Sequence, residues 1–181
     1  MPTAVALTGT PGTGKSSVAA ALGARLASIE VGDLARAMGM ARPIRGGVTV
    51  DLPRLCRRLA RSDALEGVDL VVGYLAHRLP VRDVVVLRCH PAELERRLRR
   101  ARRGSPADRR ENVVAEATDV ILLESLRPGR RVWEIDTTGR SVASVAREVA
   151  RRLRARGRSS YGSVDWLADP AVTAHLLDRP R

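Results

Sequence analysis

The feature that most constrains the fold of this chain is a glycine-rich segment close to its first residue. The segment reads Gly9-Thr10-Pro11-Gly12-Thr13-Gly14-Lys15-Ser16-Ser17 and matches the Walker A pattern G-x-x-x-x-G-K-[ST]. An apolar stretch over residues 3–8 precedes it and suits a buried parallel strand. Residues 17–27 follow it, are rich in alanine and leucine, contain no proline and suit a helix. The motif therefore has the strand-loop-helix setting that a phosphate-binding loop needs.

The residue types of this loop suit the binding of a triphosphate. Glycines let backbone N–H groups converge on phosphate oxygens, and the helix N-terminus adds a favourable dipole. In such loops the lysine reaches the β- and γ-phosphates, and the hydroxyl that follows it can bind Mg²⁺. We therefore expect the loop to hold ATP, or a closely similar nucleoside triphosphate, with Ser16 as a metal ligand. The expected contacts come from Gly12, Thr13, Gly14, Lys15, Ser16 and Ser17.

Lysine is almost absent from the sequence, since Lys15 stands beside 31 arginines. Arginine carries a wide planar fork, which cannot replace a compact ammonium group inside a tight anion-binding loop. The survival of lysine at this one position favours a functional role, and we expect Lys15 to be catalytic.

Strand-like and helix-like segments alternate along the rest of the chain. Such alternation predicts an open parallel sheet with helices on both faces and ligands at the carboxyl ends of the strands. We expect an α/β P-loop fold of three layers with five parallel strands, in one domain over residues 1–157. Residues 158–181 are polar and irregular and are expected to form a tail. The further strands are expected at 28–31, 68–72, 83–87 and 131–135, and the further helices at 33–38, 52–61, 92–103, 112–126 and 142–156.

Composition restricts the partners and the cellular location to expect for the protein. The formal net charge is +12, which favours anionic partners such as nucleotides, RNA or an acidic protein. The sequence has no apolar run of about eighteen residues that could cross a membrane, and we expect no secretory signal. Cys56 and Cys89 lack the spacing of a metal site or a disulfide framework. We therefore expect a cytoplasmic protein with no membrane partner.

Several segments outside the loop resemble one known family. Together with the Walker A loop, this ordered set resembles the archaeal adenylate kinases related to adenylate kinase isoenzyme 6, over nearly the whole chain. The segments are Val31-Gly32-Asp33-Leu34, Leu79-Pro80 before Val84-Val85-Val86-Leu87-Arg88, Glu111-Asn112-Val113, Asp136-Thr137-Thr138-Gly139, and Gly162-Ser163-Val164-Asp165-Trp166.

The resemblance implies a nucleoside monophosphate kinase that transfers a phosphoryl group from ATP to AMP or a related monophosphate. It implies a monophosphate-binding segment at about 27–50 and a short lid at about 102–111. Arginine forks on such segments can bind phosphate bidentately. We expect the lid residues Arg102 and Arg103 to contact the nucleotide, with Arg103 catalytic, and Asp33, Arg36 and His77 to contact the substrate.

Some of these residues have plainer explanations that the sequence leaves open. Arg36 can equally be part of a solvated helix face, and His77 can be an ordinary packing residue. The basic run over residues 96–100 predicts a solvated helix face rather than a binding site.

The sequence departs from the family pattern after the third expected strand. Members of the family carry an acid there, one intervening residue and then a histidine, and the acid supports Mg²⁺ through water. This chain has Val72-Gly73-Tyr74 instead. Asp69 lies three residues earlier, on the opposite face of an ideal strand, and is a weak substitute. Asp33 is another candidate, from the monophosphate side.

Other functions therefore stay open beside the kinase. The resemblance also implies an ATPase that assists maturation of the small ribosomal subunit by binding a ribosomal protein near rRNA, and the positive charge suits that neighbourhood. The loss of the acid raises a third hypothesis, a nucleotide-binding module with weak turnover. A kinase for another small metabolite is less favoured because the resemblance extends beyond the loop.

Overall fold

The computed structural model describes residues 4–23, 26–44, 47–155 and 157–177. Five strands form one parallel sheet in the order β2-β5-β1-β6-β7, which confirms the predicted fold class. Strands β1, β5 and β6 are buried along their whole length, as expected of short apolar runs in a parallel sheet. The strands are β1 (Val5–Thr8), β2 (Ser28–Glu30), β5 (Leu70–Val72), β6 (Asp83–Arg88) and β7 (Arg131–Asp136).

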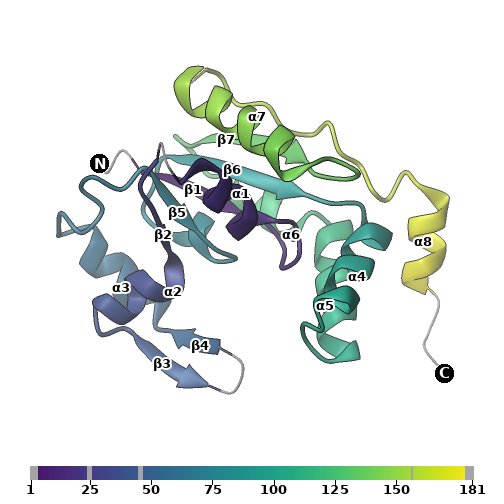
Figure 1. Ribbon diagram of the computed structural model, residues 1–181, viewed down its shortest axis with the longest axis horizontal. Coiled ribbons are helices and arrows are strands. Elements are labelled where there is room, and N and C mark those ends of the chain that lie inside the picture. Colours follow the sequence, from purple (N-terminus) through teal and green to yellow (C-terminus); the bar gives the residue numbers. More distant parts are fainter. Residues whose placement is uncertain (1–3, 24–25, 45–46, 156, 178–181) are drawn as a thin grey trace.

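Helices cover both faces of this sheet (Figure 1). On one face α1 (Lys15–Leu22) and α7 (Val142–Ala155) pack together over side chains that include Leu7, Val72 and Val85. On the other face lie α2 (Val31–Ala37), α3 (Leu52–Leu59), α6 (Val120–Ser125) and the short 3-10 turn η1 (Ala76–Arg78). The alternation of the strand side chains between the two faces creates the two cores. Among the residues that the structure describes, no helix combines the length and apolar character that crossing a membrane requires.

A small hairpin extends beyond the sheet and was not predicted. It pairs β3 (Ala41–Ile44) with β4 (Gly47–Val50) in antiparallel register. The two strands are short and β3 is mostly exposed, so they lack the apolar run that identified the other strands. The hairpin lies inside the expected monophosphate-binding segment, 27–50.

The prediction of a single helix over 112–126 is wrong, because the structure divides this region into two helices. Helix α5 (Pro106–Ala117) begins earlier, where Ser105 and Asp108 form a capping box and Pro106 occupies the first turn. The chain then breaks at Asp119, which has a positive φ of 58°, before α6 starts. The helix expected over 92–103 is α4 (Pro91–Arg100), and the expected lid spans the α4–α5 turn.

The tail is more ordered than the sequence predicted. Ser160 pairs with the edge of β7 through two backbone hydrogen bonds. Its O accepts from Glu134 N at 2.8 Å, and its N donates to Val132 O at 2.9 Å. Helix α8 (Pro170–Leu177) then follows, and His90 Nε2 lies 3.1 Å from Asp169 Oδ2 at its start. The tail therefore runs from the sheet edge to the side of α4 (Figure 1).

Candidate active site

The Walker A loop joins β1 to α1 in a shape that depends on glycine. Gly9 has φ +140°, and a Cβ atom there would lie 2.3 Å from the backbone oxygen of Leu87 on β6. Gly14 is the N-cap of α1, in a left-handed conformation and without a side-chain cap. The first-turn N–H groups of α1 are thus available to an anion at the positive end of the helix dipole.

The side chain of Lys15 is folded against this loop. Its Nζ donates to Gly9 O at 2.8 Å and to Thr10 O at 3.0 Å. Burial lowers the pKa of Lys15 to about 8, a decrease that Glu30 and Glu116 oppose and that Arg103 reinforces. A bound triphosphate would favour the charged ammonium form.

Ser16 makes a contact that the sequence did not reveal. Its Oγ donates to Oε1 of Glu30 at 2.8 Å. Glu30 is the last residue of β2 and was not among the expected site residues. The available signal was an acid at the carboxyl end of a predicted strand, but nothing local showed which strand would be its neighbour.

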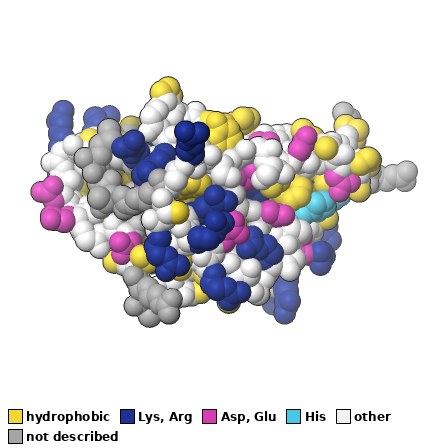
Figure 2. Space-filling model, turned by 90° about the horizontal axis from the view of Figure 1, so that it is seen from above, with side chains coloured by type: hydrophobic (Ala, Val, Ile, Leu, Met, Phe, Trp, Pro, Cys, Tyr) yellow, Lys and Arg dark blue, Asp and Glu magenta, His cyan; other side chains and the backbone are white. Residues whose placement is uncertain are grey.

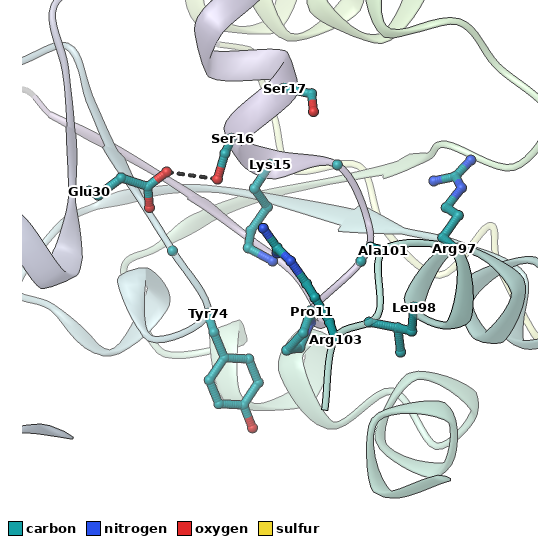
Figure 3. Close-up of a pocket in the computed structure, with 13 residues that line it drawn as sticks. Pro11, Lys15, Ser16, Ser17, Glu30, Tyr74, Arg97, Leu98, Ala101 and Arg103 are labelled. Atoms are coloured by element: carbon teal, nitrogen blue, oxygen red, sulfur yellow. Dashed lines mark hydrogen bonds between the residues drawn. The ribbon is translucent and has the colours of Figure 1, made fainter. Parts of the chain in front are cut away.

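A pocket of about 460 Å³ opens over the loop (Figure 3). It brings together Lys15 and Ser16 of the loop, Glu30 of β2, and Arg103 from the α4–α5 turn. Of the expected nucleotide contacts, Thr13 does not line it, because its buried side chain donates to Thr10 O at 2.9 Å and braces the loop. The lining residues are Pro11, Gly12, Gly14, Lys15, Ser16, Ser17, Glu30, Gly73, Tyr74, Arg97, Leu98, Ala101 and Arg103.

A second hollow of about 800 Å³ shares Glu30 and Arg103 with the first. Asp33 and Arg36 of α2 line it, so these two expected substrate residues lie together next to the loop pocket. They form an ion pair one helical turn apart, and more than half of each side chain is exposed. The remaining lining residues are Gly32, Arg102 and Gly104. Arg102 therefore faces the second hollow and not the loop pocket in which it was expected.

His77 does not line either hollow. Its side chain is fully buried, with Nδ1 3.0 Å from Thr8 Oγ1 and Nε2 2.7 Å from Glu124 Oε2. Burial lowers the pKa of His77, an effect that the Glu124 hydrogen bond opposes. His77 thus packs inside the protein, as its plainer explanation has it, and lies outside both hollows.

The basic run on α4 is only partly a solvated face. Arg96 and Arg99 are exposed and pair with acids of their own helix, Glu93 and Glu95. Arg97 differs, because it lines the loop pocket and its Nη2 donates to Thr137 O at 2.9 Å. The predicted surface role is therefore wrong for Arg97, whose contact joins α4 to the loop after β7.

The residues present can accommodate a magnesium ion with a bound nucleotide. The described part of the chain holds no group of three or more His, Cys, Asp or Glu side chains suited to a metal. Magnesium in kinases needs no such cage, because it takes a few protein oxygens together with phosphate oxygens and water. The Ser16 hydroxyl and the Glu30 carboxylate at the pocket wall provide oxygens of this kind.

Comparison with known proteins places this geometry in a family. The family model described as an AAA domain matches residues 5–119. A protein of Thermococcus onnurineus is 36% identical over 165 residues and covers 90% of both chains, and one of Archaeoglobus fulgidus is 40% identical over 173 residues and covers 91% of this chain and 92% of its own. Both carry the name "Putative adenylate kinase". This chain belongs to the archaeal adenylate kinase family.

Solved structures of other kinases share the fold of this member of the archaeal adenylate kinase family. Shikimate kinase from Acinetobacter baumannii, in complex with shikimate, superposes with a TM-score of 0.58 at 15% identity, covering 86% of this chain and 94% of its own. A gluconokinase from Sinorhizobium meliloti superposes with a TM-score of 0.50 at 22% identity, covering 86% and 93%. At these identities the likeness concerns the fold alone.

Proposed function

We propose that the protein is a nucleoside monophosphate kinase that transfers the γ-phosphoryl group of ATP to AMP or a related monophosphate. The observation that carries the proposal is the meeting of the two hollows at Glu30 and Arg103. Phosphoryl transfer needs donor and acceptor phosphates held in line, with their charge neutralised and water excluded. One hollow holds the triphosphate loop and the other is open to an acceptor beside it. The names of the archaeal relatives support this reaction.

In this proposal the residues divide between the two substrates. Lys15 and the first-turn N–H groups of α1 bind the β- and γ-phosphates, and Ser16 binds the metal. Magnesium, when held there by Ser16, would neutralise part of the phosphate charge. Arg103 reaches the transferring group from the wall between the hollows. Segment 102–111 then acts as the lid that excludes water.

The acceptor phosphate is assigned to Arg36 within the segment 27–50. Its guanidinium group can bind two phosphate oxygens at once, and Asp33 holds it in place through their ion pair. Arg102 faces the same hollow and adds positive charge. The two arginines thus form the monophosphate side of the site.

The deciding experiment follows ADP formation by the purified protein with ATP and Mg²⁺, with and without AMP. We expect AMP-dependent formation of two ADP for each ATP consumed. Lys15→Ala, purified in parallel, excludes a contaminating kinase. AMP-independent, slow ADP formation would favour an ATPase, and nucleotide binding without turnover would favour a binding module; either result contradicts the kinase.

The ribosome-linked ATPase rests on the family resemblance and on the net charge of +12. On the face shown in Figure 2, basic side chains are spread among acidic ones, and Glu148 on α7 pairs with Arg140, Arg151 and Arg152. On this face the positive charge therefore does not form one continuous patch, and this view adds no support for an RNA-binding surface. Stimulation of ATP hydrolysis by rRNA, in the absence of AMP, would be the evidence for this alternative.

A further inference from the structure

The structure suggests what replaces the acid that is missing after β5. Val72 is 1% exposed and packs in the core beneath α1 and α7, so no carboxylate is present at this position. Strand β2 lies beside β5, and Glu30 is the Cα partner of Val72 in their parallel register. Neighbouring strands lie about 4.8 Å apart, and paired residues direct their side chains to the same face. Glu30 therefore presents its carboxylate to the face on which an acid at position 72 would lie.

The carboxylate also reaches the expected metal ligand. The Ser16 hydroxyl donates its hydrogen to Glu30 Oε1 at 2.8 Å (Figure 3). Because this hydrogen is committed to Glu30, the lone pairs of the Ser16 oxygen stay available to a cation. Carboxylates that hold a metal ligand in this way orient the ligand and increase its basicity.

Glu30 also places a negative charge beside the phosphate-binding loop, where a divalent cation would need it. Among the described residues that line the loop pocket, it carries the only carboxylate, against the positive charges of Lys15, Arg97 and Arg103. Its side chain is half-buried, which strengthens its attraction for a divalent cation compared with a fully solvated acid.

The two other candidate acids are engaged elsewhere. Asp69 precedes β5, at the opposite end of the strand from Val72, and its Oδ2 accepts from Ala27 N at 2.8 Å. Asp33 pairs with Arg36 and lines only the second hollow. Neither carboxylate contacts Ser16 in the hydrogen bonds of the described residues.

We propose that Glu30 replaces the acid missing at position 72 and, with Ser16, supports the Mg²⁺ that accompanies the bound triphosphate. The proposal rests on triphosphate binding by this loop, which is part of the proposed function. It makes the apolar Val72 compatible with metal-dependent catalysis, because the support comes from the adjacent strand.

The test measures metal binding separately from turnover. Mn²⁺ affinity is followed by electron paramagnetic resonance with a non-hydrolysable ATP analogue, for the wild type, Glu30→Gln and the control Glu66→Gln, which removes an exposed acid outside both hollows. Glutamine keeps the shape and can still accept from Ser16, so the variant removes the charge alone. We expect Glu30→Gln to weaken Mn²⁺ binding about 10- to 100-fold, with Glu66→Gln unchanged. Unchanged Mn²⁺ affinity in Glu30→Gln would overturn the proposal.

A double-mutant cycle with Ser16→Ala tests whether the two residues serve one metal. If they do, the losses in Mn²⁺ affinity of Glu30→Gln and Ser16→Ala will be non-additive in the double variant. Fully additive losses would contradict joint action. Affinity for the analogue is measured for every protein, both in EDTA and with saturating Mg²⁺. A wild type that binds the analogue in neither condition contradicts both the proposed function and this proposal. If the wild type binds the analogue but Glu30→Gln leaves the Mn²⁺ affinity unchanged, only the present proposal is contradicted and the proposed function stands.

Discussion

Thr10 of the Walker A loop donates a 2.6 Å hydrogen bond to Glu116 Oε2 on α5, a residue 106 positions later in the chain. The other oxygen of this buried carboxylate accepts from Arg88 Nε at 2.8 Å and Trp166 Nε1 at 3.2 Å. Strand β6 and the tail thus meet the loop at one side chain. The loop is held in shape by long-range contacts before any nucleotide arrives, which lowers the ordering cost of binding.

Arg88 should be among the most important residues for stability. It is buried, and it pairs with Glu116, Asp119 and Glu134. Arg88→Met leaves these carboxylates without their cation, and breaking a buried ion pair in this way costs about 3–5 kcal/mol. We expect that decrease in the free energy of unfolding, measured in urea. The matched control Arg96→Ala, on the exposed face of α4, should change it by less than about 1 kcal/mol.

Gly9→Ala should distort the Walker A loop where it passes β6. The new Cβ atom would lie 2.3 Å from Leu87 O, at a φ that an L side chain rarely adopts. We expect a loss of at least about 2 kcal/mol in the free energy of unfolding, from overpacking and backbone strain. Gly157→Ala adds a Cβ atom with no neighbour within 4 Å and should be nearly neutral in the same denaturation series.

Lys15→Ala should strongly weaken triphosphate binding. Hydrogen bonds to charged groups contribute about 1.5–3 kcal/mol each, and the ammonium group can serve both the β- and γ-phosphates. We expect ATP affinity to fall by at least about 100-fold in isothermal titration calorimetry, with an unchanged melting curve as the check on folding. Wild-type affinity in this variant would refute the assignment of the loop as the phosphate site.

The affinity for ATP should depend on pH through the same side chain. Burial lowers the pKa of Lys15 to about 8 in the free protein, and the triphosphate binds the charged form. Affinity should therefore be nearly constant below pH 8 and fall about tenfold for each pH unit above it. Titrations between about pH 7 and 9.5 test this. Lys15→Ala should show no such decrease in its residual binding, and a flat wild-type profile would contradict the shift.

Arg103 should affect the rate of phosphoryl transfer more than nucleotide binding. It lines both hollows, and in the proposed reaction charge would develop between donor and acceptor at this place. Removing one such electrostatic contact costs about 10²–10³ in kcat, and we expect this for Arg103→Ala with ATP affinity changed only a few-fold. Arg100→Ala, on the exposed face of α4, is the control. Arg102→Ala should instead increase the KM for AMP, and a larger kcat loss from Arg102 than from Arg103 would exchange their assignments.

Much of the framework could be predicted because its signals are local. The Walker A spacing and the buried apolar runs of β1, β5 and β6 are readable over a few residues. The β3–β4 hairpin was missed because each strand has only four residues and β3 is mostly exposed, which leaves too short an apolar pattern to identify. The break at Asp119 was also missed, since apolar spacing continues from α5 into α6.

The sequence by itself determined the phosphate-binding loop, the α/β class and the place of the single lysine, Lys15, in that loop. These features depend on neighbouring residues and on backbone preferences. Only the tertiary structure decided that Glu30 lies opposite Val72 and against Ser16, and that His77 is enclosed by Thr8 and Glu124. Strand order in a parallel sheet arises from crossovers that join distant segments, and no local pattern specifies which side chains then become neighbours. The assembly of the candidate site is therefore a property of the folded chain.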